Sequence, residues 1–119
     1  MAFPTYQSAT QTDFATSVTA MPVNMPAVVN SGDLLQAFVS VRNAGTWTKP
    51  TNWIEIPKIG GGNLSQTGGG GVGKFDGFYK IAAGTEGGTT PQWTASTGTT
   101  GAWIVIRITN WHGTTPSRS

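Results

Sequence analysis

Five acidic residues and one histidine are the side chains with which this sequence could carry out acid–base chemistry. Two carboxylates at a set separation can hydrolyse a glycosidic bond. Asp33 and Glu86 stand in turn-like sequences, where a carboxylate accepts hydrogen bonds from nearby backbone N–H groups. Asp13 belongs to a polar leading segment. Glu55 and Asp76 fall on predicted strands, and we interpret them as part of a solvated sheet face rather than as a catalytic pair.

The single histidine, His112, has no second imidazole and no cysteine with which to share a metal. A zinc site needs several such ligands, so the composition argues against one. Residue counting leaves a Ser–His–Asp arrangement open, but the sequence has no Gly-x-Ser-x-Gly motif to present a nucleophilic serine. We interpret His112 as a turn residue, predict no cofactor and no metal, and expect the chain not to be an enzyme.

The stretch GGGGVGKF, residues 68–75, resembles a phosphate-binding loop. Such a loop places Ser or Thr after its lysine to coordinate Mg²⁺, whereas Phe75 occupies that position here. It also opens a helix whose N terminus holds the phosphates, but the residues that follow, KFDGFYKIAAG, favour a strand. We therefore predict that Gly60 to Gly73 form a flexible hairpin connection and not a nucleotide site.

Composition indicates one all-β domain that binds neither nucleic acid nor membrane. The chain has 119 residues, of which 10% are charged and 17 are glycine, and good helix formers are scarce. The net charge is +2, but the basic residues are scattered and form no stripe for nucleic acid. No apolar run reaches the length of a membrane span, and the first residues lack a signal-peptide pattern.

Six short strands separated by Gly, Pro and Thr turns form the predicted framework. They are residues 14–20, 33–42, 54–59, 74–82, 92–96 and 102–111. This pattern is typical of an antiparallel β-sandwich or jelly-roll-like domain, which we place at residues 14–119. Residues 1–13 are predicted to be an extended N-terminal arm. Six strands leave sheet edges open, so we expect a homo-oligomer or a domain completed by another surface.

Alternation within the two clearest strands separates their faces. In the strand at 33–42, one face carries Leu35, Ala37, Val39 and Val41, and the other face is mixed. This pattern is typical of a central strand. In the strand at 102–111, Ile104, Ile106 and Ile108 face one way, and Trp103, Val105, Arg107, Thr109 and Trp111 face the other.

Large aromatic residues supply both core and interface candidates. We assign Trp53 to the core, since large aromatics dominate cores of this size. Trp47 and Trp111 stand in polar surroundings, and for them core and interface remain equally open. Phe3 and Tyr6 are candidates for anchoring the predicted arm at the sheet edge of a neighbouring subunit. The candidate interface residues are therefore Phe3, Tyr6, Trp47 and Trp111.

Several segments together resemble a β-sandwich domain found in phage virion and prophage proteins. They are the strand entry GDLL (32–35), the corner PTNW (50–53), the segment YKIAAGTE (79–86) and the ending WHGTTP (111–116). The resemblance covers roughly residues 14–116. Members of that family continue with further strands after the last segment, whereas this sequence stops at Ser119.

The resemblance implies a non-enzymatic virion protein assembled in the host cytoplasm. The leading expectation is a capsid decoration or cement protein on the capsid surface, with the major capsid protein or copies of itself as partners. The alternative is a tail or fibre module that binds surface glycan, with Trp47 or Trp111 stacking on a sugar ring. Fold resemblance by itself does not choose between these roles.

Overall fold

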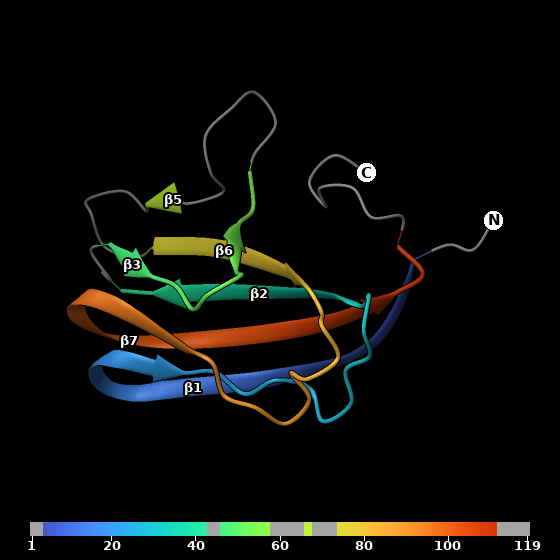
Figure 1. The fold of residues 1–119 in the computed structure, drawn as a ribbon. Coiled ribbons are helices and arrows are strands. Elements are labelled where there is room, and N and C mark those ends of the chain that lie inside the picture. Colours follow the sequence, from blue (N-terminus) through green and yellow to red (C-terminus); the bar gives the residue numbers. More distant parts are fainter. Residues whose placement is uncertain (1–3, 43–45, 58–65, 68–73, 112–119) are drawn as a thin grey trace.

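The computed structural model describes residues 4–42, 46–57, 66–67 and 74–111, in which every regular element is a β-strand. The strands are β1 (Thr5–Pro22), β2 (Leu34–Val41), β3 (Trp47–Thr48), β4 (Ile54–Glu55), β5 (Gln66–Thr67), β6 (Lys74–Ile81) and β7 (Gln92–Thr109). Their order is β1-β7-β2-β6-β4, with β3 paired to β7 and β5 paired to β6 (Figure 1). Each of these pairings is antiparallel, which confirms the predicted all-β fold.

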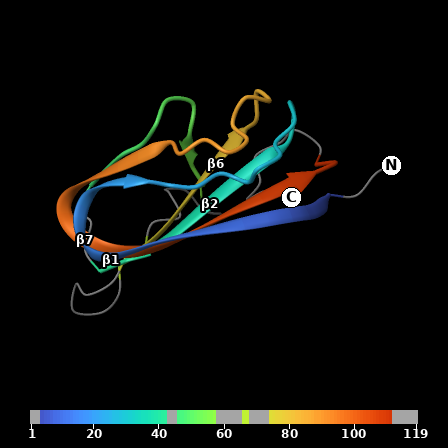
Figure 2. The same cartoon turned by 90° about the horizontal axis from the view of Figure 1, so that it is seen from below.

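Two long strands contribute to both layers of the molecule. β1 and β7 each contain 18 residues. The first half of β1 pairs with the second half of β7, which lies beside β2, while Val18–Pro22 pair with 92–99. Both strands turn back over the sheet to form a second layer, to which β3 adds at Ala95 (Figure 2). The fold is therefore β-sandwich-like.

Small residues permit the bend of β7. A Cβ atom on Gly98 would lie 2.9 Å from the Ser17 hydroxyl oxygen, and one on Gly101 would lie 2.7 Å from a Val41 methyl carbon. Glycine lets a neighbouring side chain approach the backbone this closely without being displaced. From the sequence, residues 92–96 and 102–111 are predicted to be separate strands, because the glycines between them are typical of a turn. The structure joins them in one bent strand.

The predicted arm differs most from the structure. Residues 5–13 belong to β1 and pair with β7 of the same chain, beginning with Thr5 opposite Thr109. The predicted boundary after residue 13 therefore falls inside a strand. Small polar side chains such as Thr10 and Thr12 face the interior only partly buried, so this edge strand lacks the apolar alternation that identifies a strand in sequence.

Thr10 and Thr12 also link the two layers at this edge by hydrogen bonds. The Thr10 hydroxyl donates to the Asn24 carbonyl oxygen at 2.7 Å, and the Asn24 N–H donates to the Thr12 hydroxyl oxygen at 2.9 Å. Side chains of the first layer thus satisfy backbone groups that follow the second half of β1.

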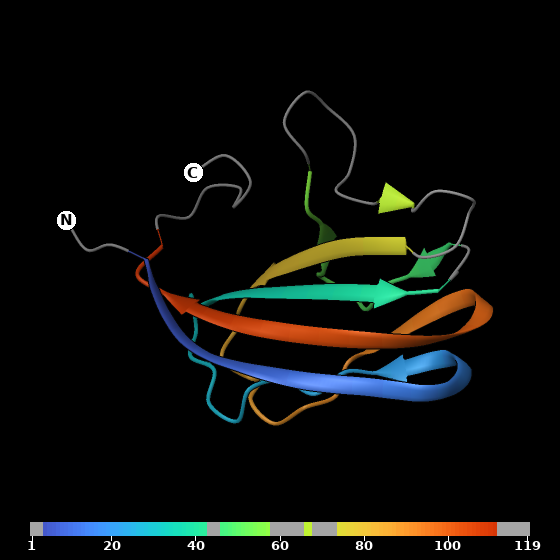
Figure 3. The same cartoon turned by 180° about the vertical axis from the view of Figure 1, so that it is seen from behind.

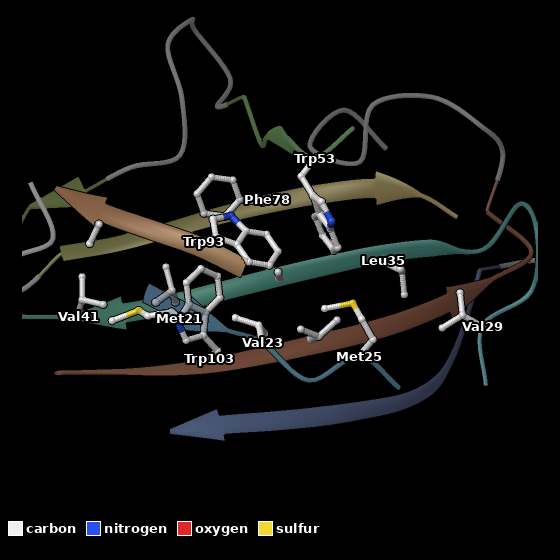
Figure 4. Packing of buried hydrophobic residues seen from close by; sticks show 14 of the residues in the cluster. Met21, Val23, Met25, Val29, Leu35, Val41, Trp53, Phe78, Trp93 and Trp103 are labelled. Atoms are coloured by element: carbon white, nitrogen blue, oxygen red, sulfur yellow. Dashed lines mark hydrogen bonds between the residues drawn. The ribbon is translucent and has the colours of Figure 1, made fainter. Parts of the chain in front are cut away.

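The core lies between the two layers and is dominated by aromatic rings (Figure 4). Ring centroids of Trp93 and Trp103 lie 4.8 Å apart, and those of Trp53 and Trp93 lie 4.9 Å apart. Trp53 is 3% exposed, as predicted. It follows a turn in which its N–H donates to the Pro50 carbonyl oxygen and Asn52 adopts a φ of 72°. The apolar face predicted for β2 is confirmed by the burial of Leu35, Ala37, Val39 and Val41.

Two ion pairs close the end of the sandwich that lies opposite the bend. Arg107 and Lys80 flank Leu35 in the register of the sheet and so point toward the interior. The Arg107 Nε–Asp33 Oδ2 distance is 2.6 Å, and the Lys80 Nζ–Glu86 Oε2 distance is 3.0 Å. These two inward-directed cations are therefore each matched by a carboxylate from a connecting turn.

The carboxylate of Glu86 is held in its charged form by its own turn. Burial by itself raises its pKa, but the N–H of Ala83, the Lys80 ammonium, the N–H of Glu86 itself and the N–H of Gly84 outweigh burial and lower the pKa from 4.5 to about 2. A folded-state pKa below the unfolded value stabilises the fold above the unfolded pKa. That contribution is lost as the pH falls through the folded pKa.

Glu86→Gln is therefore expected to lower the free energy of unfolding at neutral pH by about 1–2 kcal/mol, since charge-assisted hydrogen bonds are replaced by neutral ones. The variant should also lose the part of the acid sensitivity that falls between pH 4.5 and about 2. Urea unfolding at several pH values across this range measures both effects. A variant that keeps the full wild-type decrease in stability on acidification would contradict this role.

Candidate functional site

Three of the acidic residues weighed for catalysis, Asp33, Asp76 and Glu86, accept hydrogen bonds from backbone N–H groups. Asp33 accepts the N–H of Asn30 at 2.8 Å and pairs with Arg107, and Glu86 holds the turn described above, which confirms their predicted turn positions. Asp76 was expected on a solvated face, but it is buried, and its carboxylate accepts the N–H of Gly77 at 2.8 Å. This prediction was wrong because Asp76 falls on the inward face of β6.

The described part of the chain also bears on the phosphate loop that the sequence argued against. Lys74 begins strand β6, so the GKF sequence does not open the helix that a phosphate loop requires. Most of the connection predicted at Gly60 to Gly73 lies outside the described residues, and so does His112. Among the residues described, no three or more His, Cys, Asp or Glu side chains gather into a group that could hold a metal ion.

The four candidate interface residues have different positions. Phe3 lies outside the described residues. Tyr6 is 64% exposed on the outer surface of the sheet. Trp47 packs against the core, with its ring centroid 5.5 Å from that of Trp103. Trp111 donates its indole N–H to the Gly32 carbonyl oxygen at 2.9 Å and is partly buried. The structure thus does not bring these residues together.

A different surface stands out: the side of the sheet that faces away from the core. We call it the outer face and define it by the strand residues that point outward from β1, β7, β2, β6 and β4. Figure 3 views the molecule from the back, where β1, β7, β2 and β6 lie side by side. Register groups the residues into four rows: Tyr6–Ile108–Leu34–Ile81; Ala9–Ile106–Gln36–Tyr79–Ile54; Gln11–Ile104–Phe38–Gly77; and Asp13–Ala102–Ser40–Phe75.

Apolar side chains are concentrated on the outer face. Six large apolar side chains are exposed in the described part of the chain, and all except Val28 belong to this face: Tyr6, Ile54, Phe75, Ile81 and Ile104. The rings of Phe38 and Phe75 stack with centroids 6.0 Å apart. Of the strand residues in the four rows, Asp13 alone carries a charge.

The outer face is not flat. A hollow of about 200 Å³ lies near its centre and fourth row, lined on this side by Gln11, Phe38, Ser40, Phe75, Ala102 and Ile104. Two small residues of the fourth row line it, because Ser40 and Ala102 stand where the first two rows carry larger side chains on the same strands. A contiguous apolar surface with relief of this kind is typical of a protein–protein contact.

Of the residues on the outer face, only Tyr6 is predicted from the sequence to be an interface residue, and there it is placed on an arm. The signal was present in β7, where isoleucines alternate with Trp103 and Val105, so that both faces of the strand are apolar. From the sequence, Ile104, Ile106 and Ile108 share one face of the strand at 102–111, but that face is not predicted to be a contact surface. In the structure β7 lies between β1 and β2, and its outward side chains are half-buried or exposed, whereas the outward Leu34 of the neighbouring β2 is 3% exposed.

Comparison of the chain with protein-family models, with curated proteins and with solved structures finds no significant match. Within the residues that the structure describes, no helix has the length and apolar character needed to cross a membrane. The functional assignment therefore depends on the outer face and on the sequence features themselves.

Proposed function

We propose that this chain is a non-enzymatic structural protein that works by joining protein surfaces, and that its role is decoration of a phage capsid. The observation that carries the proposal is the outer face, where five large apolar side chains are exposed on one side of a rigid sheet. Leaving this much apolar surface in water is unfavourable, and burying it against a neighbouring subunit offsets the cost. The virion setting comes from the resemblance in strand and turn residues.

The architecture suits a protein that reinforces a lattice. Its two layers are tied by an aromatic core, and the ion pairs at one end fix the turns against the sheet. A rigid body loses little conformational freedom on binding, so a modest interface suffices. On a symmetric particle each contact is repeated many times, and contacts that are weak singly add up. The neighbours of the outer face are then the major capsid protein, other copies of the chain, or both.

The alternative, a glycan-binding module of a tail or fibre, is less well supported. It assigned sugar stacking to Trp47 and Trp111. The ring of Trp47 contacts Trp103 and Phe78 at the edge of the core, and the indole N–H of Trp111 is already bonded to a backbone carbonyl. Neither indole is presented as a free platform, whereas the outer face has the size and apolarity of a protein contact.

Mixing the purified chain with empty heads of the phage whose genome encodes it tests this function. We expect saturable binding of hundreds of copies per head, at a number fixed by the capsid lattice, and a higher temperature of head disruption measured by light scattering. Binding at only a few sites per complete particle would assign the chain to the tail. Heads that neither bind the chain nor gain heat resistance would overturn the proposal.

A further inference from the structure

We propose that the outer face pairs with the outer face of a second copy, so that the chain acts as a two-fold symmetric dimer. This inference rests on the proposed function, since it names the neighbour of the same surface. Two sheets that bury their faces against each other, about 10 Å apart and with strands within about 30° of alignment, form a standard packing in proteins. A two-fold pairing uses the same patch on both copies, so the patch must complement itself.

Self-complementarity can be checked from the register. Consider a two-fold axis that lies in the plane of the interface and runs across the strands. It places each strand antiparallel to the same strand of the second copy, with the first row over the fourth and the second row over the third. On β7, Ile108 then faces Ala102, and on β6, Tyr79 faces Gly77. Large side chains meet small ones at these two positions, and apolar side chains face each other where Ile106 meets Ile104 and where Ile81 meets Phe75.

The same arrangement places the single charge of the face near a partner. On β1 the first-row residue is Tyr6 and the fourth-row residue is Asp13. The rotation sets the phenol of one copy over the carboxylate of the other, and does so twice. A tyrosine hydroxyl can donate a hydrogen bond to a carboxylate, so the charge is compensated at the rim of the contact.

The other possible two-fold axis gives a poorer fit. An axis parallel to the strands keeps each row over itself and sets β7 over β2. Ile104 would then face Phe38, while Ala102 would face Ser40. The same axis sets β1 over β6, so that Asp13 would face the ring of Phe75 instead of the hydroxyl of Tyr6, and a charge set against an apolar ring is unfavourable. The geometry therefore points to the antiparallel pairing.

The area of the outer face and its low charge are consistent with a reversible dimer. Four strands about 4.8 Å apart and eight residues long at about 3.4 Å each span roughly 500 Å² per copy, or roughly 1,000 Å² for the pair, which is near the lower limit of specific interfaces. β4 adds Ile54 at one side. Because Asp13 is the one charge among the strand residues of the face, no like charges meet at the centre of the pair.

Sedimentation equilibrium of the purified chain across a range of concentrations tests the pairing. We expect a monomer–dimer equilibrium in the micromolar range of Kd, as an interface of this size allows. Ile104→Glu should raise Kd at least 100-fold, because two unpaired carboxylates would be buried near the centre of the contact. Val28→Glu is the matched control: Val28 is also exposed but lies outside the outer face, so its Kd should stay unchanged. Circular dichroism of both variants serves as the control for folding.

Cross-linking distinguishes the two axes and does not depend on a destabilising variant. The chain contains no cysteine, so single-cysteine variants react only at the chosen position. Ala102→Cys and Ile108→Cys stand six residues apart on β7, about 20 Å along the strand. With a short bis-maleimide, a mixture of the two variants should cross-link strongly and each variant alone weakly. Strong cross-linking of Ile108→Cys alone would overturn the antiparallel geometry.

The outcomes for the dimer and for the capsid role are separate. A chain that is monomeric at all concentrations but still saturates empty heads would overturn the dimer and leave the proposed function in place. A chain that dimerises through the outer face but binds no heads would support the dimer and overturn the capsid role. Equal Kd values for Ile104→Glu and the wild type would show that any dimer uses another surface, and would overturn the pairing proposed for this face.

Discussion

Trp93→Ala is expected to lower the free energy of unfolding by about 3–5 kcal/mol, the largest effect expected among the variants of Trp93, Asp33 and Glu86. Trp93 is 0% exposed and projects from the first half of β7, in the second layer. Its ring lies 4.9 Å from that of Trp53, 4.8 Å from that of Trp103 and 5.6 Å from that of Phe78. Removing it takes away the central contact between the two layers and leaves a cavity that the surrounding rings cannot fill.

The conservative variant Trp93→Phe separates packing from hydrogen bonding. The indole nitrogen of Trp93 is buried without a hydrogen-bond partner among the described residues. Phenylalanine therefore loses volume but no hydrogen bond, and it also removes a buried unsatisfied donor. Trp103→Phe serves as the comparison variant, because it loses a hydrogen bond as well as volume. The indole N–H of Trp103 donates to the Met21 sulfur at 3.3 Å.

Urea unfolding monitored by far-ultraviolet circular dichroism measures these effects. Trp93→Phe should recover at least half of the stability lost in Trp93→Ala. A loss below about 1 kcal/mol for Trp93→Ala would contradict a shared core between the layers, since surface substitutions cost that little. Such a result would mean that the bent half of β7 is not packed on the sheet in solution.

Asp33→Ala is expected to have the second largest effect, about 3 kcal/mol, because it leaves a charge without its partner in a largely buried site. The side chains of Arg107 and Asp33 are 13% and 9% exposed. The same Asp33 oxygen that pairs with Arg107 also accepts the N–H of Asn30. Alanine removes both interactions, which frees the turn before β2 and leaves the guanidinium facing the interior.

A double-mutant cycle isolates the ion pair from the turn. Asp33→Asn keeps an acceptor for the Asn30 N–H but removes the charge, and Arg107→Met keeps the length of the apolar stem. The double variant should be more stable than the sum of the single losses predicts, with a coupling of about 1–3 kcal/mol. Thermal unfolding of the four proteins gives the coupling. Losses that add within about 0.5 kcal/mol would show that the pair contributes nothing specific.

The features of this fold that depend on neighbouring residues could be predicted from the sequence. Alternation in 33–42 identified the buried face of β2, and the turn positions of Asp33 and Glu86 followed from their neighbours. The burial of Trp53 followed from the large apolar area of its ring. These features depend on residues close in sequence or on one side chain's chemistry, so short-range reasoning suffices for them.

The bend and the first strand could not be predicted in this way. Gly98 and Gly101 read as a turn, and only the closeness of Ser17 and Val41 shows that they let one strand continue through a bend. Residues 5–13 lack apolar alternation, and they form a strand because β7 offers its edge to them. Both features are contacts between segments about 60 to 100 residues apart, which local patterns do not contain.

The sequence by itself determined that this chain is all-β and which side of β2 is buried. Only the tertiary structure decided that Ile104, Ile81, Phe75 and Tyr6 share one exposed face. Alternation states which residues lie on the same side of one strand. Whether another layer covers that side depends on how the whole chain folds back, and here the long strands cover one side of the sheet while Tyr6, Phe75, Ile81 and Ile104 on the other side stay exposed.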